Sequence, residues 1–512
     1  MTVFAAVFPL KRSADNRTMV DQQNNPFIIM GRTSWFITSL SSNDYTYYLN
    51  DCTNRGYNSI EFHVLNHDPR GNNEPYAGNG ALPFLKQLNG NNWNGSLTYA
   101  NINNEALDYT TENTNYWNHV DGLLKSCNDR GIQVFMFPSY VGYNGSDQGW
   151  MNEMVANGTN RMYQYGAWLA NRYKNQSNLV WMLCGDKGGT ISFTASEGAV
   201  EQMMANGLRS VAGMVPTNYS AELNSETIAT DDQYVGNRMT INGAYSWTGD
   251  VITQCRRGYS YSPTMPTFLL EEPYDEEGSD GNGYNPSATQ PVRRFQWWGC
   301  LSGIGGYISG NGYVWPFNAG WTNHLNTQGS RDMVRMHTFI RSVNWHQLVP
   351  SGLSGMRTLV VSNANNVTAA ANTNGDLLVV YRPPSHTGSF SVSLVGMKSN
   401  LAAQWFDPTS AQYFTTTATS GKTNVYTVPG NNSVGQADWV LLITASDPPK
   451  LQLTLNPPNV DLLVTGTPGI YTLYKTYDTV WSTVWTRTSV VDTISYSEPI
   501  EQTNKLFRVA RH

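Results

Sequence analysis

The sequence is poor in charge and in long apolar runs, and each shortage excludes a class of protein. Charged residues make up 14% of the 512 positions, and the formal net charge is −6. Because no block of Lys or Arg interrupts this slightly acidic chain, we expect neither nucleic acid nor an anionic membrane as a partner. No apolar run approaches the roughly 20 residues of a membrane-spanning helix.

Cysteine is also scarce, which argues against a disulfide framework and a zinc site. The cysteines are widely spaced, odd in number and form no Cys-x-x-Cys pair, whereas both kinds of site use paired cysteines at short spacings. We expect most of them to be buried apolar fillers. The five are Cys52, Cys127, Cys184, Cys255 and Cys300.

The composition is that of a folded protein with many uncharged polar residues. Hydrophobic residues make up 40% and aromatic residues 12%, so the chain is not of the disordered class. Aromatic faces and side-chain amides suit carbohydrate, because sugar rings stack on the former and sugar hydroxyls bond the latter. The N-terminal MTVFAAVFPLKRSADNRT is too short in its apolar part for a signal peptide. We nevertheless expect an extracellular, periplasmic or virion-associated protein, exported after signal removal or by another route.

The first two thirds of the chain alternate strand-like and helix-like segments. Near-continuous apolar strands separated by helices indicate a parallel sheet that is buried on both faces. The repeat count favours a (β/α)8 TIM barrel over residues 1–347 rather than a doubly wound sheet. The expected strands are PFIIMG, SIEFHVL, IQVFMFP, LVWMLCG, TFLLEE and GIGGYIS, with the fifth and sixth placed near AGMVPTNYSAEL and MTINGAYSW. The expected helices are SSNDYTYYLNDCTNRG, NTNYWNHVDGLLKSCNDRG and GTNRMYQYGAWLANRYKNQ.

Two all-β domains are expected to follow the barrel. Residues 348–447 contain short alternating strands separated by Gly, Pro and Asn turns, which is typical of a β-sandwich. Residues 448–512 are also rich in strand patterns and predict a small β-sandwich-like module.

The barrel fold directs attention to the ends of its strands, where the working residues of such barrels lie. The fourth strand is followed by Asp186, and the seventh by Glu271 and Glu272. Two carboxylates about 5–5.5 Å apart are what a retaining glycosidase needs. The plainer interpretation is a helix-capping Asp186 and a solvated acidic loop. Spacing alone does not decide between these interpretations, nor between Glu271 and Glu272, which point to opposite faces if both lie in the strand.

Six stretches in order give the region from Asn25 to about Trp345 a resemblance to the apiosidase-like glycoside hydrolases, family 140 and its relatives. These stretches are NPFIIMGRTSW, YLNDCTNRGYNSIEF, YWNHVDGLLKSCNDRGIQVFMFP, ANRYKNQSNLVWMLCGD, PTFLLEEPYDEE and RRFQWWGCLSGIGGYISGNGYVW. The resemblance implies that Asp186, at the end of the Trp-Met-x-x-Gly-Asp strand, is the acid/base.

The same resemblance implies which glutamate is the nucleophile. In the family it lies five residues after a Pro and three before a Tyr, and Pro266 and Tyr274 both select Glu271. An alignment to a Glu-Pro pair selects Glu272 instead, but it requires a one-residue insertion after Pro266. The chain departs from the family at Arg32, where Asp is usual, and we expect this strand-end position to affect the substrate. The following sandwich resembles the domain with a collagen-binding label that follows the barrel in many relatives.

Seven further side chains at or just after strand ends are candidates for sugar binding. Stacking or hydrogen bonding to a sugar and simple packing of the barrel rim explain each of them about equally well. They are Trp35, His63, Tyr140, Tyr143, Tyr245, Tyr274 and Trp315. We predict no metal site, because His63 and His67 are not on a helix, and the acidic stretch DEEGSDGNG lacks the ligand spacing of an EF-hand calcium loop.

The sequence thus predicts a retaining O-glycoside hydrolase that acts on a plant or microbial polysaccharide or its side chains. Glu271 is the predicted nucleophile and Asp186 the predicted acid/base, with no cofactor and with carbohydrate as the substrate; the sequence leaves the oligomeric state open and slightly favours a monomer. The main alternative is a non-catalytic carbohydrate-binding or adhesive surface or virion protein on the same barrel. A protease or collagen-binding protein is a weaker alternative, because no Ser–His or His-Glu-x-x-His constellation is visible.

Overall fold

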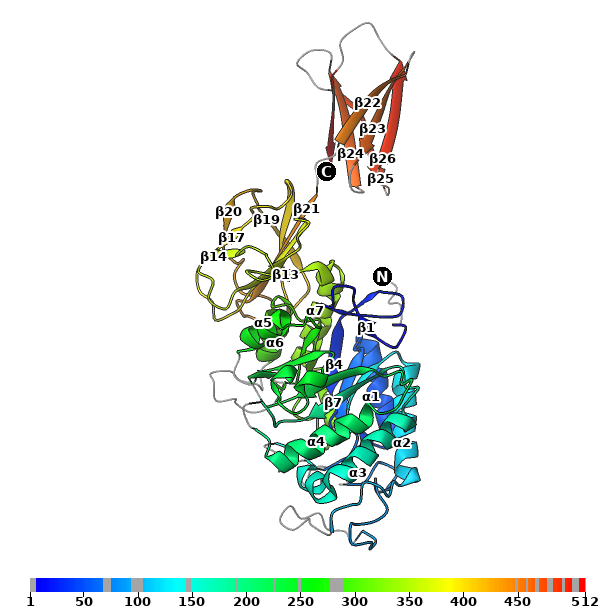
Figure 1. Ribbon diagram of the computed structural model, residues 1–512. Coiled ribbons are helices and arrows are strands. Elements are labelled where there is room, and N and C mark those ends of the chain that lie inside the picture. Colours follow the sequence, from blue (N-terminus) through cyan, green and yellow to red (C-terminus); the bar gives the residue numbers. More distant parts are fainter. Residues whose placement is uncertain are drawn as a thin grey trace.

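A closed parallel barrel forms the first part of the molecule (Figure 1). The computed structural model describes residues 6–511 apart from 68–74, 94–104, 144–148, 190–191, 225, 247–249, 272, 277–288, 447–449, 457–458, 466–468, 477–481, 490–492 and 500–505. The sheet order is β8-β7-β6-β5-β4-β12-β11-β10-β9. Its parallel strands are β4 (Ile29–Thr33), β5 (Ser59–His63), β6 (Gln133–Phe137), β7 (Leu179–Cys184), β8 (Asn218–Glu222), β10 (Asn242–Tyr245), β11 (Thr267–Leu269) and β12 (Gly306–Ser309).

The barrel closes between its fifth and sixth strands, β8 and β10. The backbone N–H groups of Thr240 and Ile241 donate to the carbonyl oxygen of Tyr219 at 2.9 and 3.1 Å, and the short strand β9 (Thr227–Ile228) pairs antiparallel with β10. The predicted (β/α)8 barrel is therefore confirmed, and β8 and β10 lie within the two stretches where the fifth and sixth strands were expected.

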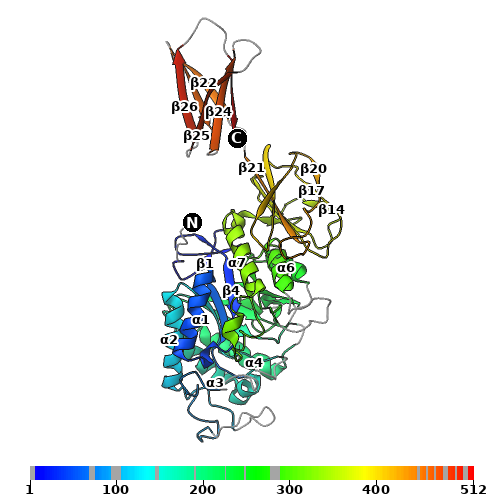
Figure 2. The same cartoon turned by 180° about the vertical axis from the view of Figure 1, so that it is seen from behind.

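Helices pack around the outside of the sheet in both views (Figure 2). They are α1 (Ser42–Arg55), α2 (Thr114–Asp129), α3 (Met151–Arg172), α4 (Ala195–Leu208), α5 (Val251–Ser260), α6 (Thr289–Cys300) and α7 (Gln328–Arg341). Between β8 and β10 the described residues form β9 and two 3-10 turns, η3 (Ala229–Asp231) and η4 (Gly236–Arg238), in place of an α-helix.

The local sequence explains where these helices begin and end. Ser41 caps α1 by accepting from the N–H of Asp44, and Gly56 ends it in the left-handed conformation at φ 86°, as the sequence predicts. Helix α3 starts at Met151, seven residues before its expected start at Gly158. The cause is that Gly158 kinks the helix at φ 73° without ending it.

A β-sandwich packs directly on helices α6 and α7 of the barrel. Trp297 stacks on Tyr381 with ring centroids 5.9 Å apart, and Phe339 meets Phe406 at 4.7 Å, so barrel and sandwich share one hydrophobic core. The larger sheet contains β13 (Val349–Pro350), β15 (Thr368–Ala371), β16 (Leu377–Arg382), β21 (Trp439–Ser446), β18 (Asn400–Phe406) and β19 (Tyr413–Thr416), and the smaller one contains β14 (Val360–Ser362), β17 (Phe390–Ser393) and β20 (Thr423–Tyr426).

A fully buried arginine clamps this interface. Arg293 on α6 donates to Asp332 of α7 at 2.7 Å and to both oxygens of Asp438, beside β21, at 2.7 and 2.9 Å. Tyr381 donates a further bond to Asp438 at 3.0 Å. The three charges are thus paired as burial requires, and the sandwich is fixed to the barrel.

Small three-stranded sheets form both ends of the described chain, one at the N-terminus and two at the C-terminus. At the N-terminus, β1 (Lys11–Arg12), β2 (Met19–Val20) and β3 (Pro26–Phe27) form an antiparallel sheet. At the C-terminus, two three-stranded sheets form the predicted small sandwich, with Leu462 and Leu473 buried from opposite sheets. Their strands are β22 (Lys450–Asn456), β23 (Asn459–Thr465) and β26 (Thr493–Pro499), and β25 (Ser482–Ser489), β24 (Gly469–Thr476) and β27 (Leu506–Arg511).

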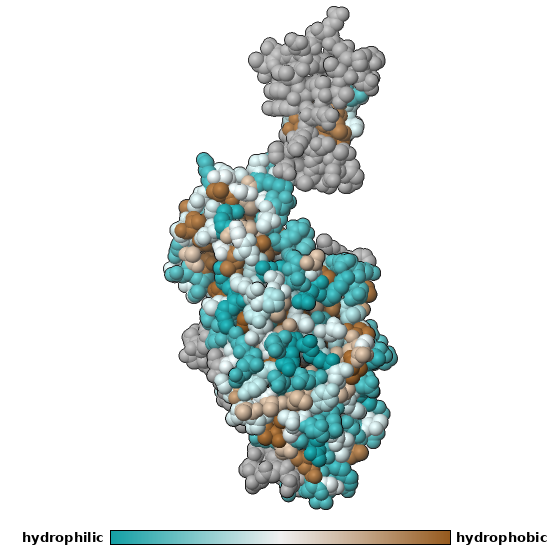
Figure 3. Space-filling view, in the orientation of Figure 1, coloured by the Kyte–Doolittle hydropathy of each residue, from teal (hydrophilic) through white to brown (hydrophobic). Residues whose placement is uncertain are grey.

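The described surface mixes polar and apolar groups. Figure 3 shows small apolar groups scattered among hydrophilic residues on the face that it presents. In the part of the chain that the structure describes, no helix has both the length and the apolar character to cross a membrane. All five cysteines are buried with free thiols, which confirms their expected role as fillers.

Candidate active site

The ends of three barrel strands bring three carboxylates together. Asp186 follows β7 by two residues, Glu222 is the last residue of β8, and Glu271 follows β11 by two residues. One carboxylate oxygen from each lies within 4.8 Å of the other two. Glu222 and Glu271 are buried, whereas Asp186 is partly exposed. The predicted pair is therefore within contact range in the barrel mouth, with a third acid that the sequence did not indicate.

The backbone at both predicted residues is strained. Asp186 has φ 53° and Glu271 has φ 56°, a left-handed region that costs a non-glycine residue about 1–3 kcal/mol and is found preferentially at functional sites. Strand β11 already ends at Leu269, so the pleat does not decide which glutamate faces inward. The backbone turn at Glu271 brings its carboxylate to the mouth, and Glu272 lies outside the described residues.

Glu271 is surrounded by hydrogen-bond donors. The indole N–H of Trp35 donates to its Oε1 at 2.9 Å, and the hydroxyl of Tyr274 donates to the same oxygen. Tyr245 contributes a further hydrogen bond. An indole N–H can only donate, so this environment favours the ionised form of Glu271.

Asp186 has fewer donors. The hydroxyl of Tyr140 donates to its Oδ2 at 3.1 Å, and Tyr245 bonds it as well. Burial raises the pKa of both Asp186 and Glu271, and the neighbouring charge of Asp186 raises the pKa of Glu271 further. Like charges this close do not both ionise readily. The pair therefore retains one proton near neutral pH, which the two carboxyl groups share.

Aromatic rings form one wall of the mouth. His63 stacks on both Trp35 and Tyr140, with ring centroids at 5.2 and 4.9 Å and interplanar angles of 21° and 22°, and the rings of Trp35 and Tyr140 also meet at 5.6 Å. Burial lowers the pKa of His63 to about 3, so it is a neutral member of the stack. Trp315 stacks on Tyr274 at 6.0 Å and extends the wall past Glu271.

Six of the seven predicted sugar-binding side chains thus lie around the two carboxylates. The seventh, Tyr143, is 56% exposed on the loop after β6 and lies on the rim. His67, which a metal site would pair with His63, instead directs its Nε2 at the carboxylate of the buried Glu153, 3.0 Å away.

The acidic stretch after Glu271 is anchored rather than freely solvated where it is described. Asp275 is buried, and its N–H donates to the carbonyl oxygen of Gly310. Glu276 accepts from Asn311 at 3.0 Å and contacts His324 at 2.6 Å. The later carboxylates of this stretch lie outside the described residues.

Arg32 does not reach the substrate side of the barrel. Its guanidinium bonds Asp51 of α1 at 2.7 Å, and Leu325 and Ser330 near the start of α7 at 2.8 and 3.0 Å. We expected Arg32, which replaces the usual Asp of the family, to affect the substrate from the end of the first strand, and this expectation is therefore wrong. Arg32 connects β4 to two outer helices instead.

Sequence reasoning missed two carboxylates, Glu222 and Glu61. Glu61 lies in β5 two residues before His63, so both face the barrel interior. Among the described residues no hydrogen bond to the Glu61 carboxylate occurs, and burial together with the charge of Glu271 raises its pKa well above the ordinary value. Its period-two spacing from His63 was the signal that could have found it.

Comparisons with known proteins agree with this geometry. Residues 13–347 match the family model described as "Apiosidase-like, catalytic domain", and residues 357–444 match one described as a collagen-binding domain of a collagenase. A solved glycoside hydrolase family 5 protein from Bacteroides vulgatus has 19% identity and a TM-score of 0.66, covering 85% of this chain and 93% of its own. A second solved structure, named glycoside hydrolase, has 17% identity and a TM-score of 0.66, covering 85% and 96%. At these identities the similarity concerns the fold, and no curated protein matches.

Proposed function

The chain belongs to the apiosidase-like family of glycoside hydrolases, and from that premise we propose that it is a retaining O-glycosidase of a plant or microbial polysaccharide or its side chains. The observation that carries the proposal is the approach of Asp186 and Glu271 oxygens to within 4.8 Å. Retaining enzymes hold their carboxyl groups about 5–5.5 Å apart, and inverting enzymes about 6.5–9.5 Å, because a water must fit between.

In the first step, Glu271 attacks the anomeric carbon while Asp186 gives its proton to the departing glycosidic oxygen. The bond between the anomeric carbon and that oxygen breaks, and a glycosyl ester with Glu271 forms. The donors Trp35 and Tyr274 hold the Glu271 carboxylate in place for this attack. In the second step, Asp186 removes a proton from water, which attacks the anomeric carbon and releases Glu271.

The loss of charge on Glu271 accounts for the change of role that Asp186 must make, and Glu222 adds a constant bias toward protonated Asp186. Before attack, two neighbouring carboxylates oppose the ionisation of Asp186, which keeps it protonated as an acid. Once Glu271 is esterified, its charge is gone, and only Glu222 opposes ionisation, so the pKa of Asp186 falls and it serves as base. Glu222 is in this scheme a positioning residue that biases the proton.

One set of isosteric variants tests these roles. Glu271→Gln should lose several orders of magnitude in kcat on every substrate. Asp186→Asn should lose as much on natural glycosides but far less on substrates whose leaving group needs no protonation, with azide restoring turnover. Glu222→Gln should lose about tenfold to a hundredfold and shift the basic limb of the pH profile to lower pH.

The stereochemistry of the first product gives the decisive readout. Nuclear magnetic resonance of the fresh product should show the substrate's anomeric configuration. An inverted product, or near-native turnover by Glu271→Gln, contradicts the proposal. Glycan binding by the wild type without release of reducing ends favours the alternative, a non-catalytic adhesive protein. We also propose that the protein acts outside the cytoplasm, where such polysaccharides are met.

A further inference from the structure

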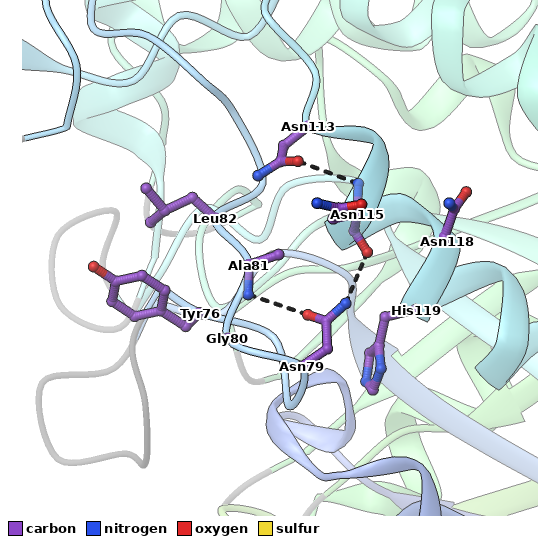
Figure 4. Close-up of a pocket in the computed structure, with 9 residues that line it drawn as sticks. All are labelled: Tyr76, Asn79, Gly80, Ala81, Leu82, Asn113, Asn115, Asn118 and His119. Carbon is purple, nitrogen blue, oxygen red and sulfur yellow. Dashed lines mark hydrogen bonds between the residues drawn. The ribbon is translucent and has the colours of Figure 1, made fainter.

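The long connection between β5 and α2 builds a second pocket on the catalytic side of the barrel. It is an open hollow of about 690 Å³ between the loop over residues 76–82 and the first turns of α2. Figure 4 shows Asn115 and Asn118 on the helix at one side of the hollow, and Tyr76 and Leu82 on the loop at the other. Loops that follow the carboxyl ends of barrel strands surround the active site, so this pocket shares a face with the site.

Hydrogen bonds connect this pocket to the catalytic centre. The N–H of Gly78 donates to the carbonyl oxygen of Thr38 at 2.9 Å, and the amide of Asn66 joins the hydroxyl of Thr38 to the carbonyl of Tyr76. Thr38 is three residues from Trp35, which spans about 11 Å at most. The loop passes so close to the β4–α1 connection that a Cβ on Gly78 would lie 1.9 Å from the Leu40 carbonyl oxygen. The loop that lines the pocket is therefore held against the β4–α1 connection that also carries Trp35.

Among the residues that the structure describes, the lining is rich in amides and carries no Lys, Arg, Asp or Glu. Burial lowers the pKa of His119, which also lines the hollow, and so favours its neutral form. Asn79 is already engaged, since it donates to the Asn115 carbonyl at 2.8 Å and accepts from Ala81 at 3.1 Å. The side-chain oxygens of Asn113 and Asn118 accept from the backbone N–H of Asn115 at 3.1 Å and from Arg172 at 3.3 Å. The side-chain NH₂ groups of Asn113, Asn115 and Asn118 make no hydrogen bond with the described residues. An amide offers both donor and acceptor to a sugar hydroxyl, and Tyr76 and Leu82 offer apolar surface for the C–H face of a sugar ring.

We propose that this pocket is a distal subsite that binds neutral sugar units of the same polysaccharide whose bond is cleaved at Asp186 and Glu271. The inference rests on the proposed function for the cleavage itself. A neutral ligand is favoured over an anionic one, because the described lining contains no Lys or Arg to pair with an anion. Exposed amides that merely bind solvent are the competing explanation.

Substrate length separates these explanations. In the double variant Asn115→Ala/Asn118→Ala, KM for a polysaccharide that the wild type cleaves should rise about tenfold with kcat unchanged. KM for the shortest cleaved aryl glycoside should not change, because that substrate does not reach the pocket. Tyr76→Ala should give the same pattern. The matched control is Asn171→Ala/Asn175→Ala, which removes two exposed amides at and just beyond the C-terminal end of α3, away from the pocket lining.

Binding without turnover keeps the test independent of catalysis. The inactive Glu271→Gln protein should be retarded in gels that contain galactomannan or arabinoxylan, and the added pocket substitutions should abolish most of the retardation. If the wild type cleaves no glycan but this retardation is seen, the proposed function fails and the subsite stands. Equal losses on long and short substrates, no loss on the polymer, no retardation by any neutral polymer, or stronger retardation by polygalacturonate would each overturn the subsite.

Discussion

Replacing Tyr274 by phenylalanine should move the acidic limb of the pH profile of kcat/KM to higher pH. The hydroxyl of Tyr274 donates to Oε1 of Glu271, where Trp35 also donates at 2.9 Å. A carboxylate must be ionised to attack, so the pKa of the nucleophile sets the acidic limb. Phenylalanine keeps the ring that stacks on Trp315 and removes the hydroxyl, which also accepts from the indole N–H of Trp35 at 2.7 Å.

The structure fixes both the direction and the size of this effect. A hydrogen bond to a charged group contributes about 1.5–3 kcal/mol, and a change of one pKa unit equals about 1.4 kcal/mol. Loss of the Tyr274 donor should therefore raise the pKa of Glu271 by about one to two units. The lower end is expected, because Trp35 and Tyr245 continue to donate. The basic limb reports the deprotonation of Asp186 and should move less.

The assay is the full pH profile of kcat/KM on one substrate, for the wild type and the variant. Tyr143→Phe is the matched control, since it removes a tyrosine hydroxyl from the exposed rim and should leave both limbs in place. An unchanged acidic limb in Tyr274→Phe, with thermal unfolding also unchanged, would refute the argument that donors keep Glu271 ionised. A shift confined to the basic limb would indicate that Glu271 and Asp186 have exchanged roles.

Two further predictions concern buried charges outside the reacting pair. Glu61 has a raised pKa in the folded state, so it destabilises the fold increasingly as the pH rises above the ordinary pKa of glutamate. Glu61→Gln should therefore leave the free energy of unfolding unchanged near pH 4 and increase it by up to about 3–4 kcal/mol at pH 7. An equal effect of the substitution at both pH values would contradict this. Arg293→Met should lower the free energy of unfolding by about 3–5 kcal/mol, because Asp332 and Asp438 lose their shared cation. Denaturant titration measures this free energy, and a loss below about 1 kcal/mol would show that the Arg293 ion pairs do not stabilise the fold.

The sequence predicted the barrel well where its strands are apolar and poorly where they are not. The fifth strand, β8, reads Asn-Tyr-Ser-Ala-Glu and carries no apolar run. The reason lies inside the barrel, where a Cβ on Gly243 of β10 would lie 2.7 Å from Leu270 and 3.2 Å from the hydroxyl of Ser220. Small and polar residues are required there, so the periodic signal is weak. Glu222, at the end of this weak strand, was missed for the same cause.

Some of the motifs that carry the family resemblance serve the fold rather than the chemistry. Arg293 lies in the RRFQWW stretch, and Asp438 begins DWVLLI in the sandwich. They meet in the buried clamp between α6 and the sandwich, which no spacing along the chain could indicate. Conversely, strand alternation could not choose between Glu271 and Glu272, because Glu271 has a left-handed backbone and lies outside the strand. Only its spacing from Pro266 and Tyr274 indicated that Glu271 is the residue in the barrel mouth.

The Arg32 side chain points outward from the barrel, so other residues must determine substrate selectivity. Since its guanidinium is held by Asp51 and by the start of α7, a change at this position alters the attachment of β4 to its helices and not the contacts of a sugar. The end of the first strand instead presents Trp35 to the site, and Trp35 is committed to Glu271. Selectivity for the glycan must then come from surfaces beyond these fixed groups. The hollow between the β5–α2 loop, which is bonded to Thr38, and the amides of Asn115 and Asn118 on α2 is placed to supply it.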